Sequence, residues 1–377
     1  MLNILIDGTA LRPKPSGIGL YVYHLINGLE KLQTEENFNL SVSYQPSVKN
    51  WLKGDLSIPE KLQNYSQVHC LPIPVTLSNF LAKYPNPSLA YFEKFLGSPT
   101  IVHGPDHVVY PCRNSLKVMT ITDLTFIKYP QFVNSIVKTY TERVKQCLKW
   151  TDLVITISQS SKQDIIDYLG VKPDKVYVTP LASRYSFQEV TEEQDKPLKP
   201  YLLFVSTLEP RKNVKTLILA FNLLKQTYKI EHRLILIGQK GWKYQPIFET
   251  LENSPWKHEI DHLDYVSDEK VAWFYRHADV FVYPSIYEGF GLPVLEAMTL
   301  GTPVVTSNTS SIPEVTGDAA LLVDPNDPHQ LAEAIFQIIS DHNFRQTLIR
   351  KGQERAKLFS WEKTARETFK AYCSLLK

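Results

Sequence analysis

Short apolar runs rich in β-branched residues recur along the chain, and an amphipathic stretch follows each of them. These runs are too short for core helices and have the composition of strands that are buried on both faces. Strands of this kind that alternate with helices predict parallel sheets in an α/β protein. The runs comprise residues 2–6, 117–121, 153–157, 202–205, 234–237, 280–283 and 304–305.

A polar segment that ends in two prolines, residues 187–200, interrupts this alternation. Its composition is typical of a linker between domains. A chain of 377 residues is long enough for two domains. We therefore expect two doubly wound α/β domains, residues 1–186 and 201–359, and a final helix within residues 360–377. Ligands of such domains bind outside the carboxyl ends of the strands.

The composition excludes several classes of protein. A net charge of +2 gives no basic excess of the kind that nucleic-acid binding needs. No apolar run approaches the roughly 20 residues of a membrane helix, and the first residues do not resemble a signal peptide. The four cysteines have no paired short spacing, which fits a reducing compartment. We expect a cytoplasmic protein that does not bind nucleic acid.

Two glycines, Gly17 and Gly19, lie between the first predicted strand and the first predicted helix. They permit a tight loop with free amides ahead of a helix N-terminus, which is a site for an anion. The loop is not the dinucleotide-binding fingerprint, because Val22 stands where the third glycine is needed. The alternative is that the glycines serve only the turn.

Two cations, Arg211 and Lys212, lie in the segment of residues 206–213, which directly follows the predicted strand at residues 201–205 and opens a predicted helix. Cations at the carboxyl end of a strand, beside a helix N-terminus, suit a diphosphate. The alternative is a solvated helix start with two surface cations.

Two carboxylates, Glu288 and Glu296, follow the predicted strand at residues 280–283 in a segment that contains two glycines. The glycines permit a close approach of the backbone to a ligand. Burial of the carboxylates without polar partners would be costly, so we expect them to meet hydroxyls or cations. The alternatives are a salt-bridged Glu296 with an exposed Glu288, or the acid pair of a glycosidase, which would not need the two cations.

The sequence from His258 to His262 matches the H-E-x-x-H pattern of zinc proteases. That pattern binds zinc only on a helix, where the two histidines share a face. Residues 260–266 predict a strand instead, on which the histidines would stand about 13 Å apart. No metal site is predicted here.

In their order along the chain, these motifs resemble the retaining glycosyltransferases of family 4, also called group 1. The pair Glu288 and Glu296 resembles the E-x7-E pattern of that family, and residues 206–213 resemble its phosphate loop. The resemblance covers nearly the whole chain and includes the loop at Gly17. It implies the GT-B fold, in which two Rossmann-like domains face each other across a cleft and the final helix packs back on the N-terminal domain.

The resemblance also implies roles for single residues. Lys212 and Arg211 would neutralise the diphosphate of a nucleotide-sugar donor, and Glu288 would hold hydroxyls of the donor sugar. The remaining donor contacts would come from Gly17 over the phosphates, Glu296 on the ribose, Val266 against the base, and the backbone amides of Phe290, Gly291 and Leu292. The family implies no metal and no cofactor.

The chain departs from the family at one position. Many relatives have His-Asp-Leu where this chain has Thr122, Asp123 and leucine. Threonine does not titrate near neutral pH, so acid–base help from this position is not expected. Two upstream histidines, His103 and His107, are candidates to compensate on the acceptor side; the alternative is that both are polar loop residues.

The loop around Arg211 and Lys212 resembles that of mannosyltransferases of surface polysaccharide synthesis, which favours GDP-mannose as the donor and a glycan or lipid-linked acceptor. A UDP-sugar is the alternative donor. The alternatives are an epimerase or hydrolase of the same fold, a non-catalytic nucleotide-sugar-binding subunit, or a nucleotide-binding dehydrogenase.

Residues 131–150 predict a basic amphipathic helix that could touch a membrane face, the alternative being an ordinary packed helix. The oligomeric state is not predicted.

Overall fold

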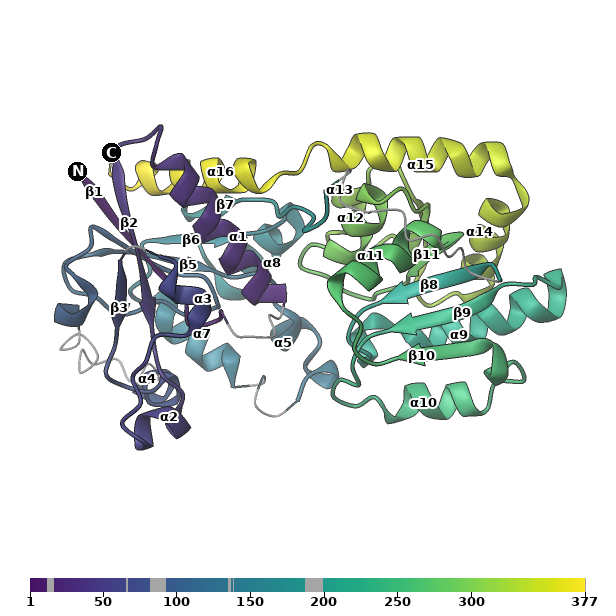
Figure 1. Ribbon diagram of the computed structural model, residues 1–377, viewed down its shortest axis with the longest axis horizontal. Coiled ribbons are helices and arrows are strands. Elements are labelled where there is room, and N and C mark those ends of the chain that lie inside the picture. Colours follow the sequence, from purple (N-terminus) through teal and green to yellow (C-terminus); the bar gives the residue numbers. More distant parts are fainter. Residues whose placement is uncertain are drawn as a thin grey trace. The chain divides into compact units, whose positions relative to one another are not determined.

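The computed structural model describes residues 1–11, 17–65, 67–81, 93–134, 137, 139–186 and 199–376. The chain forms two compact units. Unit 1 comprises Met1–Lys128, Ser135–Leu181 and Trp361–Lys377, and unit 2 comprises Tyr129–Asn134 and Ala182–Ser360. Each unit is a parallel sheet with helices on its faces, as the α/β prediction requires (Figure 1). Most of the predicted linker, residues 187–198, lies outside the described residues.

The sheet of unit 1 has the strand order β3-β2-β1-β4-β5-β6-β7, and all of its strands are parallel. The strand order reverses between β1 and β4. The loops that follow these two neighbouring strands therefore lead in opposite directions from the edge of the sheet. The strands are β1 (Leu2–Asp7), β2 (Phe38–Tyr44), β3 (Val68–Cys70), β4 (Ile101–Gly104), β5 (Leu116–Thr120), β6 (Leu153–Thr156) and β7 (Val176–Val178).

The described helices of unit 1 include its last element, α16 (Trp361–Ser374), which packs against the first helix, α1 (Gly17–Leu32). The two helices approach closely because Gly28 has no side chain: a Cβ there would lie 2.8 Å from that of Ala365. The others are α2 (Val48–Leu52), α3 (Glu60–Gln63), α4 (Val75–Leu81), α5 (Thr125–Lys128), α7 (Tyr140–Leu148) and α8 (Gln159–Leu169).

A buried chain of polar side chains ties α16 into the sheet. The hydroxyls of Tyr21 on α1 and Thr120 on β5 lie 3.1 Å apart, and the Thr120 hydroxyl lies 2.7 Å from Nε2 of His103 on β4. Nδ1 of the same imidazole lies 2.6 Å from the hydroxyl of Tyr372 on α16. All four residues are buried. The polar atoms of this core therefore satisfy one another, as buried polar groups must.

Two sequence predictions about local structure were wrong. Residues 131–150 do not form a single helix: a 3-10 turn at Pro130–Phe132 ends at Val133, whose backbone is extended, and α7 begins only at Tyr140. The strand predicted to run to Val266 is β10, which ends at Leu263. An extended residue cannot continue a helical hydrogen-bond ladder, so hydrophobic spacing alone overestimated the helix.

The sheet of unit 2 has the order β10-β9-β8-β11-β12-β13 and is also parallel throughout. Its order reverses between β8 and β11. The strands are β8 (Tyr201–Val205), β9 (Arg233–Ile237), β10 (Ile260–Leu263), β11 (Val280–Tyr283), β12 (Val304–Ser307) and β13 (Leu321–Val323). The helices are α9 (Val214–Leu223), α10 (Gln245–Glu252), α11 (Asp268–His277), α12 (Leu292–Thr299), α13 (Ile312–Thr316), α14 (Pro328–Ser340) and α15 (His342–Ala356).

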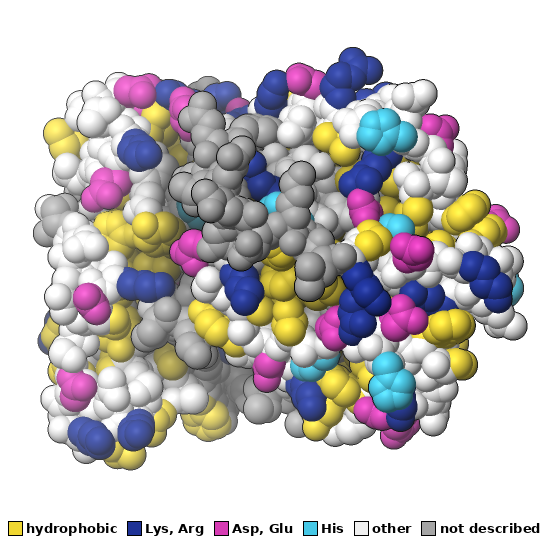
Figure 2. All heavy atoms as spheres, turned by 45° about the vertical axis from the view of Figure 1, so that its right-hand side comes forward, with side chains coloured by type: hydrophobic (Ala, Val, Ile, Leu, Met, Phe, Trp, Pro, Cys, Tyr) yellow, Lys and Arg dark blue, Asp and Glu magenta, His cyan; other side chains and the backbone are white. Residues whose placement is uncertain are grey.

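The surface carries charges of both signs. On the face that Figure 2 shows, basic and acidic side chains are interspersed, in keeping with the net charge of +2. Among the described residues, no helix has the length and apolar character needed to cross a membrane.

Candidate functional site

The two loops that the sequence singled out leave neighbouring strands of unit 2. One follows β8 and leads to α9 through a 3-10 turn at Pro210–Lys212; the other follows β11 and leads to α12. Because β8 pairs with β11 at the point where the strand order reverses, both loops start from the same stretch of the sheet edge. This is the place where open α/β sheets bind ligands.

Five side chains from these strands and loops meet in what we call the Glu288 cluster: Tyr283, Ser285, Glu288, Arg211 and Lys212. Lys212 Nζ lies 2.6 Å from Glu288 Oε1, and Arg211 Nη1 lies 2.9 Å from Glu288 Oε2. The hydroxyls of Ser285 and Tyr283 donate to Oε1 of the same carboxylate at 2.6 and 3.0 Å. The structure thus brings together the three residues for which the sequence predicts the central roles.

The cluster holds its charges away from water. Burial alone would raise the pKa of Glu288, but the charges of Arg211 and Lys212, together with hydrogen bonds from Lys212 and Ser285, lower it to about 2. Burial and the neighbouring Arg211 lower the pKa of Lys212, although Glu288 opposes them. Arg211 also pairs with the buried Glu209 at 2.9 Å. Two cations therefore face two carboxylates.

The start of α12 adds backbone donors beside the cluster. Gly291 has a φ of 102° and comes just before the helix, where a Cβ would lie 2.6 Å from Ile312 Cδ1. No described acceptor receives the amides of Phe290 and Gly291, and the amide of Leu292 belongs to the first turn, which has no intrahelical partner. Amides in this position favour an anionic ligand.

The second carboxylate of the motif lies in a different environment. Glu296, on α12, pairs with Arg184 at 2.9 Å between Nε and Oε1, and the Tyr275 hydroxyl lies 3.4 Å from its Oε2. Burial raises the pKa of Glu296, although Arg184 opposes the shift. Arg184 also pairs with Asp268 at the start of α11, two residues after Val266. The structure thus separates Glu296 from Glu288 and places it with the residues around Val266.

Sequence reasoning missed three residues of these two groups. Tyr283 is the last residue of β11 and Ser285 follows it by two positions, and their place at the carboxyl end of a strand was a usable signal. Arg184 lies more than 100 residues before Glu296 in the chain, and no pattern in the sequence links the two.

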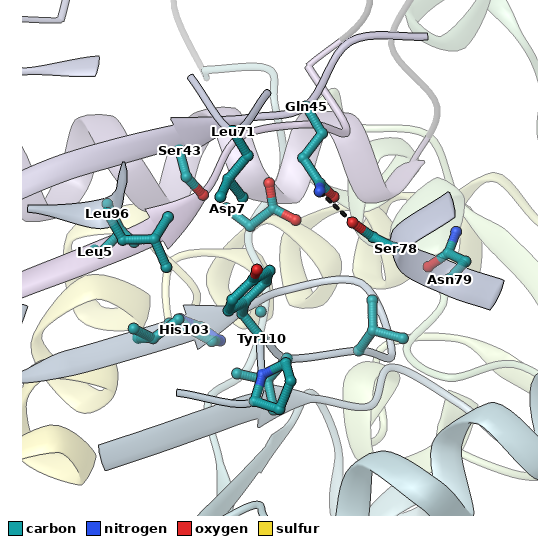
Figure 3. A pocket seen from close by; sticks show the side chains of 15 residues that line it. Leu5, Asp7, Ser43, Gln45, Leu71, Ser78, Asn79, Leu96, His103 and Tyr110 are labelled. Atoms are coloured by element: carbon teal, nitrogen blue, oxygen red, sulfur yellow. Dashed lines mark hydrogen bonds between the residues drawn. The ribbon is translucent and has the colours of Figure 1, made fainter. Parts of the chain in front are cut away.

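Unit 1 has a cavity of about 50 Å³ at its own reversal point, between the ends of β1 and β4. Figure 3 shows Asp7, Gln45, Asn79 and Tyr110 around it. One oxygen of Asp7 accepts from the amide and hydroxyl of Thr9, and burial raises the pKa of Asp7 despite these bonds. The cavity has room for one or two water-sized groups, at roughly 30 Å³ each. Gly17, at the start of α1, is exposed and follows residues that are not described.

The two candidate histidines differ in what they can do. His103 uses both ring nitrogens in the buried polar chain, and burial lowers its pKa to about 3. His107 lies beyond the end of β4 with a φ of 57°, and its Nε2 is 3.0 Å from the Thr122 hydroxyl. Its buried Nδ1 has no hydrogen-bond partner in the described part of the chain. Asp123, next to Thr122, accepts from the amide of Thr125 at the start of α5.

No group of three or more His, Cys, Asp or Glu side chains that could hold a metal ion occurs within the described residues. His258 lies in a 3-10 turn and His262 on β10, as the strand prediction for this segment required. The predicted absence of a metal and of a cofactor stays a prediction.

Comparison with known proteins gives a consistent result. Residues 187–355 match the model of the family "Glycosyl transferases group 1". The chain is 35% identical over 281 residues to O-antigen chain mannosyltransferase B of Escherichia coli, covering 72% of this chain and 74% of the relative. Sucrose-phosphate synthase from Thermosynechococcus elongatus has a similar structure, with a TM-score of 0.74 and 22% identity over 100% of this chain and 99% of that chain.

Another similar structure is that of Anabaena Alr3699/HepE in complex with UDP and glucose, with a TM-score of 0.72 and 16% identity over 99% of this chain and 100% of that chain. At these identities the structural likeness shows the fold, whereas the likeness in sequence shows the family. The chain therefore belongs to the group 1 glycosyltransferases: it is a hexosyltransferase with the GT-B fold.

Proposed function

We propose that the chain transfers mannose from GDP-mannose, with retention of configuration, to a glycan or lipid-linked acceptor of surface polysaccharide synthesis. The choice of mannose is supported by the name of the relative that is 35% identical, an O-antigen chain mannosyltransferase. The single observation that carries the transferase assignment is the Glu288 cluster, because it combines the buried Lys212 and the partly buried Arg211 with a carboxylate at the reversal point of the sheet.

In this proposal Lys212 and Arg211 exchange their present partner for the donor diphosphate. Cleavage of the anomeric bond leaves negative charge on the diphosphate, and fixed cations and helix N-terminal amides stabilise that charge. Glu288, released from both cations, accepts hydrogen bonds from hydroxyls of the donor sugar. Phe290, Gly291 and Leu292 supply amides, Glu296 holds the ribose, and Val266 lies against the base. The donor is a substrate, and no metal or cofactor takes part.

The proposal gives the acceptor to unit 1. Its cavity offers Asp7, Gln45 and Asn79 to a hydroxyl-bearing group. Of the two histidines, His107 is the one proposed to assist, because it contacts Thr122 and one of its ring nitrogens has no partner among the described residues. His103 is proposed to be structural, since its hydrogen bonds are used within the core. Gly17 is proposed to contact the donor phosphates, and the predicted cytoplasmic location belongs to the same proposal.

The test is a thermal-shift panel with GDP, UDP, ADP, CMP and NAD, followed by donor turnover with the nucleotide that binds. A ligand at about 100 times its Kd adds roughly 2.7 kcal/mol to the free energy of unfolding. A selective shift with GDP, and release of GDP from GDP-mannose with an acceptor present, would support the proposal. A UDP-sugar is the second candidate donor, favoured by the likeness to a protein solved with UDP and glucose. A shift with NAD alone would overturn the transferase assignment.

A further inference from the structure

Four buried polar atoms of unit 1 have no hydrogen-bond partner among the described residues. They are Nδ1 of His107, the hydroxyl oxygen of Thr125, Nε of Arg143 and Nε2 of Gln146. His107 follows β4, and Thr125 begins α5. Arg143 and Gln146 lie three residues apart on α7, on the same side of the helix. Buried polar groups are normally hydrogen-bonded, so several unpartnered ones in one region indicate that a ligand completes them.

Aromatic rings connect the segments that carry these atoms. The guanidinium carbon of Arg143 lies 4.0 Å from the centroid of the Tyr140 ring. The Tyr140 centroid lies 6.4 Å from that of His107 and 6.0 Å from that of Phe126. The rings of His107 and Phe126 meet edge to face at 5.6 Å, and Phe126 is next to Thr125 in the chain. We call His107, Thr125, Tyr140, Arg143 and Gln146 the Arg143 cluster.

The charge of Arg143 has no counter-ion in the described part of the chain. Arg143 forms no ion pair there, and its Nε is buried without an acceptor. Burial lowers the pKa of His107, and the charge of Arg143 acts in the same direction. Asp106 and Asp123 oppose that shift, but Asp123 is engaged with the amide of Thr125. The cluster therefore favours an anionic ligand, because an unmade hydrogen bond to a charged group is costly.

The unpartnered atoms also select the kind of anion. The side chain of Arg143 and the amide nitrogen of Gln146 can only donate, and the Thr125 hydroxyl can donate as well. Thr125 and Gln146 are 8% and 7% exposed, so little water reaches them. A ligand here must supply several acceptors together with negative charge. A phosphate group does both, and its oxygens match the planar donor fork of a guanidinium.

We propose that the Arg143 cluster binds a phosphate group of the acceptor, held by Arg143, Gln146 and Thr125. The acceptor is then a phosphorylated sugar, or a sugar joined to a lipid through a diphosphate. His107 keeps the role proposed above towards the acceptor hydroxyl. This site rests on the proposed function, in which unit 1 takes the acceptor and the cations of unit 2 take the donor diphosphate.

One stretch of unit 1 joins the cluster to the cavity proposed for the acceptor. The loop that carries His107 continues into residues 108–110, which line that cavity. The indole N–H of Trp150, just after α7, donates to the Val109 carbonyl at 3.1 Å. Helix α7 and this loop are thus fixed to each other, so a hydroxyl in the cavity and a phosphate at the cluster can belong to one acceptor.

The diphosphate of the donor is a poorer occupant of the cluster. Unit 2 already offers it Arg211, Lys212 and the backbone amides at the start of α12. The Arg143 cluster contributes one cation, which suits a single phosphate group.

The first test measures binding of inorganic phosphate to the full chain by phosphorus NMR line broadening. The chain is saturated with the nucleoside diphosphate that the thermal-shift panel selects, or carries Lys212→Ala if none binds, so that the site in unit 2 does not contribute. Arg143→Gln should weaken phosphate binding at least about tenfold, because a charge-assisted contact is lost. Arg143→Lys should bind with intermediate affinity, since it keeps the charge without the fork. The matched control is Lys145→Gln, an exposed lysine on the same helix, which should bind like the wild type.

The second test separates the acceptor from the donor. Transfer is measured with methyl mannoside, mannose 1-phosphate and mannosyl decyl diphosphate as acceptors. The wild type should have a lower KM for both phosphorylated acceptors, and Arg143→Gln should raise those KM values at least about tenfold without raising the KM of the donor. A lower KM for the diphosphate than for the monophosphate assigns the phosphate to a lipid carrier, whereas equal values assign it to a phosphorylated sugar.

Several results would overturn the proposal. They are no phosphate binding beyond the site in unit 2, acetate binding as tight as phosphate binding, equal losses in Lys145→Gln and Arg143→Gln, or an Arg143→Gln effect on the KM of the donor instead of the acceptor. A failure of the proposed function looks different: no acceptor would release GDP from GDP-mannose, while phosphate binding would still depend on Arg143.

Discussion

Replacement of Lys212 by alanine tests the Glu288 cluster most directly. Lys212 Nζ lies 2.6 Å from Glu288 Oε1 and 2.6 Å from the Tyr283 hydroxyl, and the residue is buried. Removal of one preorganised charge donor costs about 2.7–4 kcal/mol of transition-state stabilisation, so we expect kcat to fall roughly 100- to 1,000-fold. GDP should also bind more weakly, because one of the two cations proposed to hold the diphosphate is lost.

The same change should lower stability. Removal of one member of a buried ion pair costs about 3–5 kcal/mol. Arg211 and Ser285 still contact the Glu288 carboxylate, so the loss should fall at the lower end, about 3 kcal/mol. Lys212→Met keeps much of the side-chain volume and should match Lys212→Ala in kcat, because the lost charge and not the cavity is responsible.

Lys225→Ala is the control for loss of a buried lysine. Lys225 is also buried in unit 2, where its Nζ lies 2.5 Å from Glu259 Oε2 and donates to the Ile230 carbonyl, away from the Glu288 cluster. Its removal should lower Tm while leaving kcat near the wild-type value. The assay is release of GDP from GDP-mannose with acceptor present, at a temperature where every variant is folded. A kcat of Lys212→Ala within tenfold of the wild type would refute the role given to Lys212, as would an equal loss in Lys225→Ala.

Three further outcomes are expected. Because the pKa of Glu288 is lowered to about 2, its ionised form stabilises the fold above its ordinary pKa of 4.5, and roughly 3 kcal/mol should be lost as pH falls from 4.5 towards 2; urea unfolding against pH should show this loss in the wild type and much less of it in Glu288→Gln. His107→Ala should lower turnover roughly 100-fold, the usual contribution of one positioned acid–base group, as measured by GDP release. Arg184→Met should cost about 3–5 kcal/mol in urea unfolding, because it leaves the Glu296 carboxylate buried without its cation.

Each of these has a result that contradicts it. Parallel pH profiles for the wild type and Glu288→Gln would mean that the carboxylate is not held ionised by its neighbours. Wild-type turnover in His107→Ala would show that His107 does not supply the acid–base help that Thr122 cannot give. The Arg184→Met loss should be partly restored by adding Glu296→Gln, which removes the unpaired charge; additive losses in the double variant would show that the two side chains act independently.

The alternation of apolar runs predicted both sheets, because strands buried on both faces carry a continuous signal. The position of Arg211, Lys212 and Glu288 after strands was also predictable. Their pairing was not, since Lys212 and Glu288 are 76 residues apart and meet only because β8 pairs with β11. Strand order is a property of the folded sheet that local patterns do not carry.

The two candidate histidines also show what the sequence alone does not predict. His103 and His107 are four residues apart and looked equivalent in the sequence. The strand β4 carries His103 into the core, while the left-handed turn at His107 directs that ring to Thr122. Four residues of chain, passing from strand to turn, thus separate a structural role from a proposed functional one. The residues between them, Gly104, Pro105 and Asp106, signal the turn but not which histidine the core buries.

The packing of α16 on α1 has a consequence for synthesis on the ribosome. Unit 1 is built from residues near both ends of the chain, so the partner of α1 emerges after all of unit 2. Until Tyr372 arrives, the imidazole of His103 lacks the hydroxyl that bonds its Nδ1. Unit 2, contiguous apart from one short segment, has no such delay. We therefore expect the second unit to become protease-resistant first in the nascent chain, and unit 1 to depend on chaperones until its last helix is released.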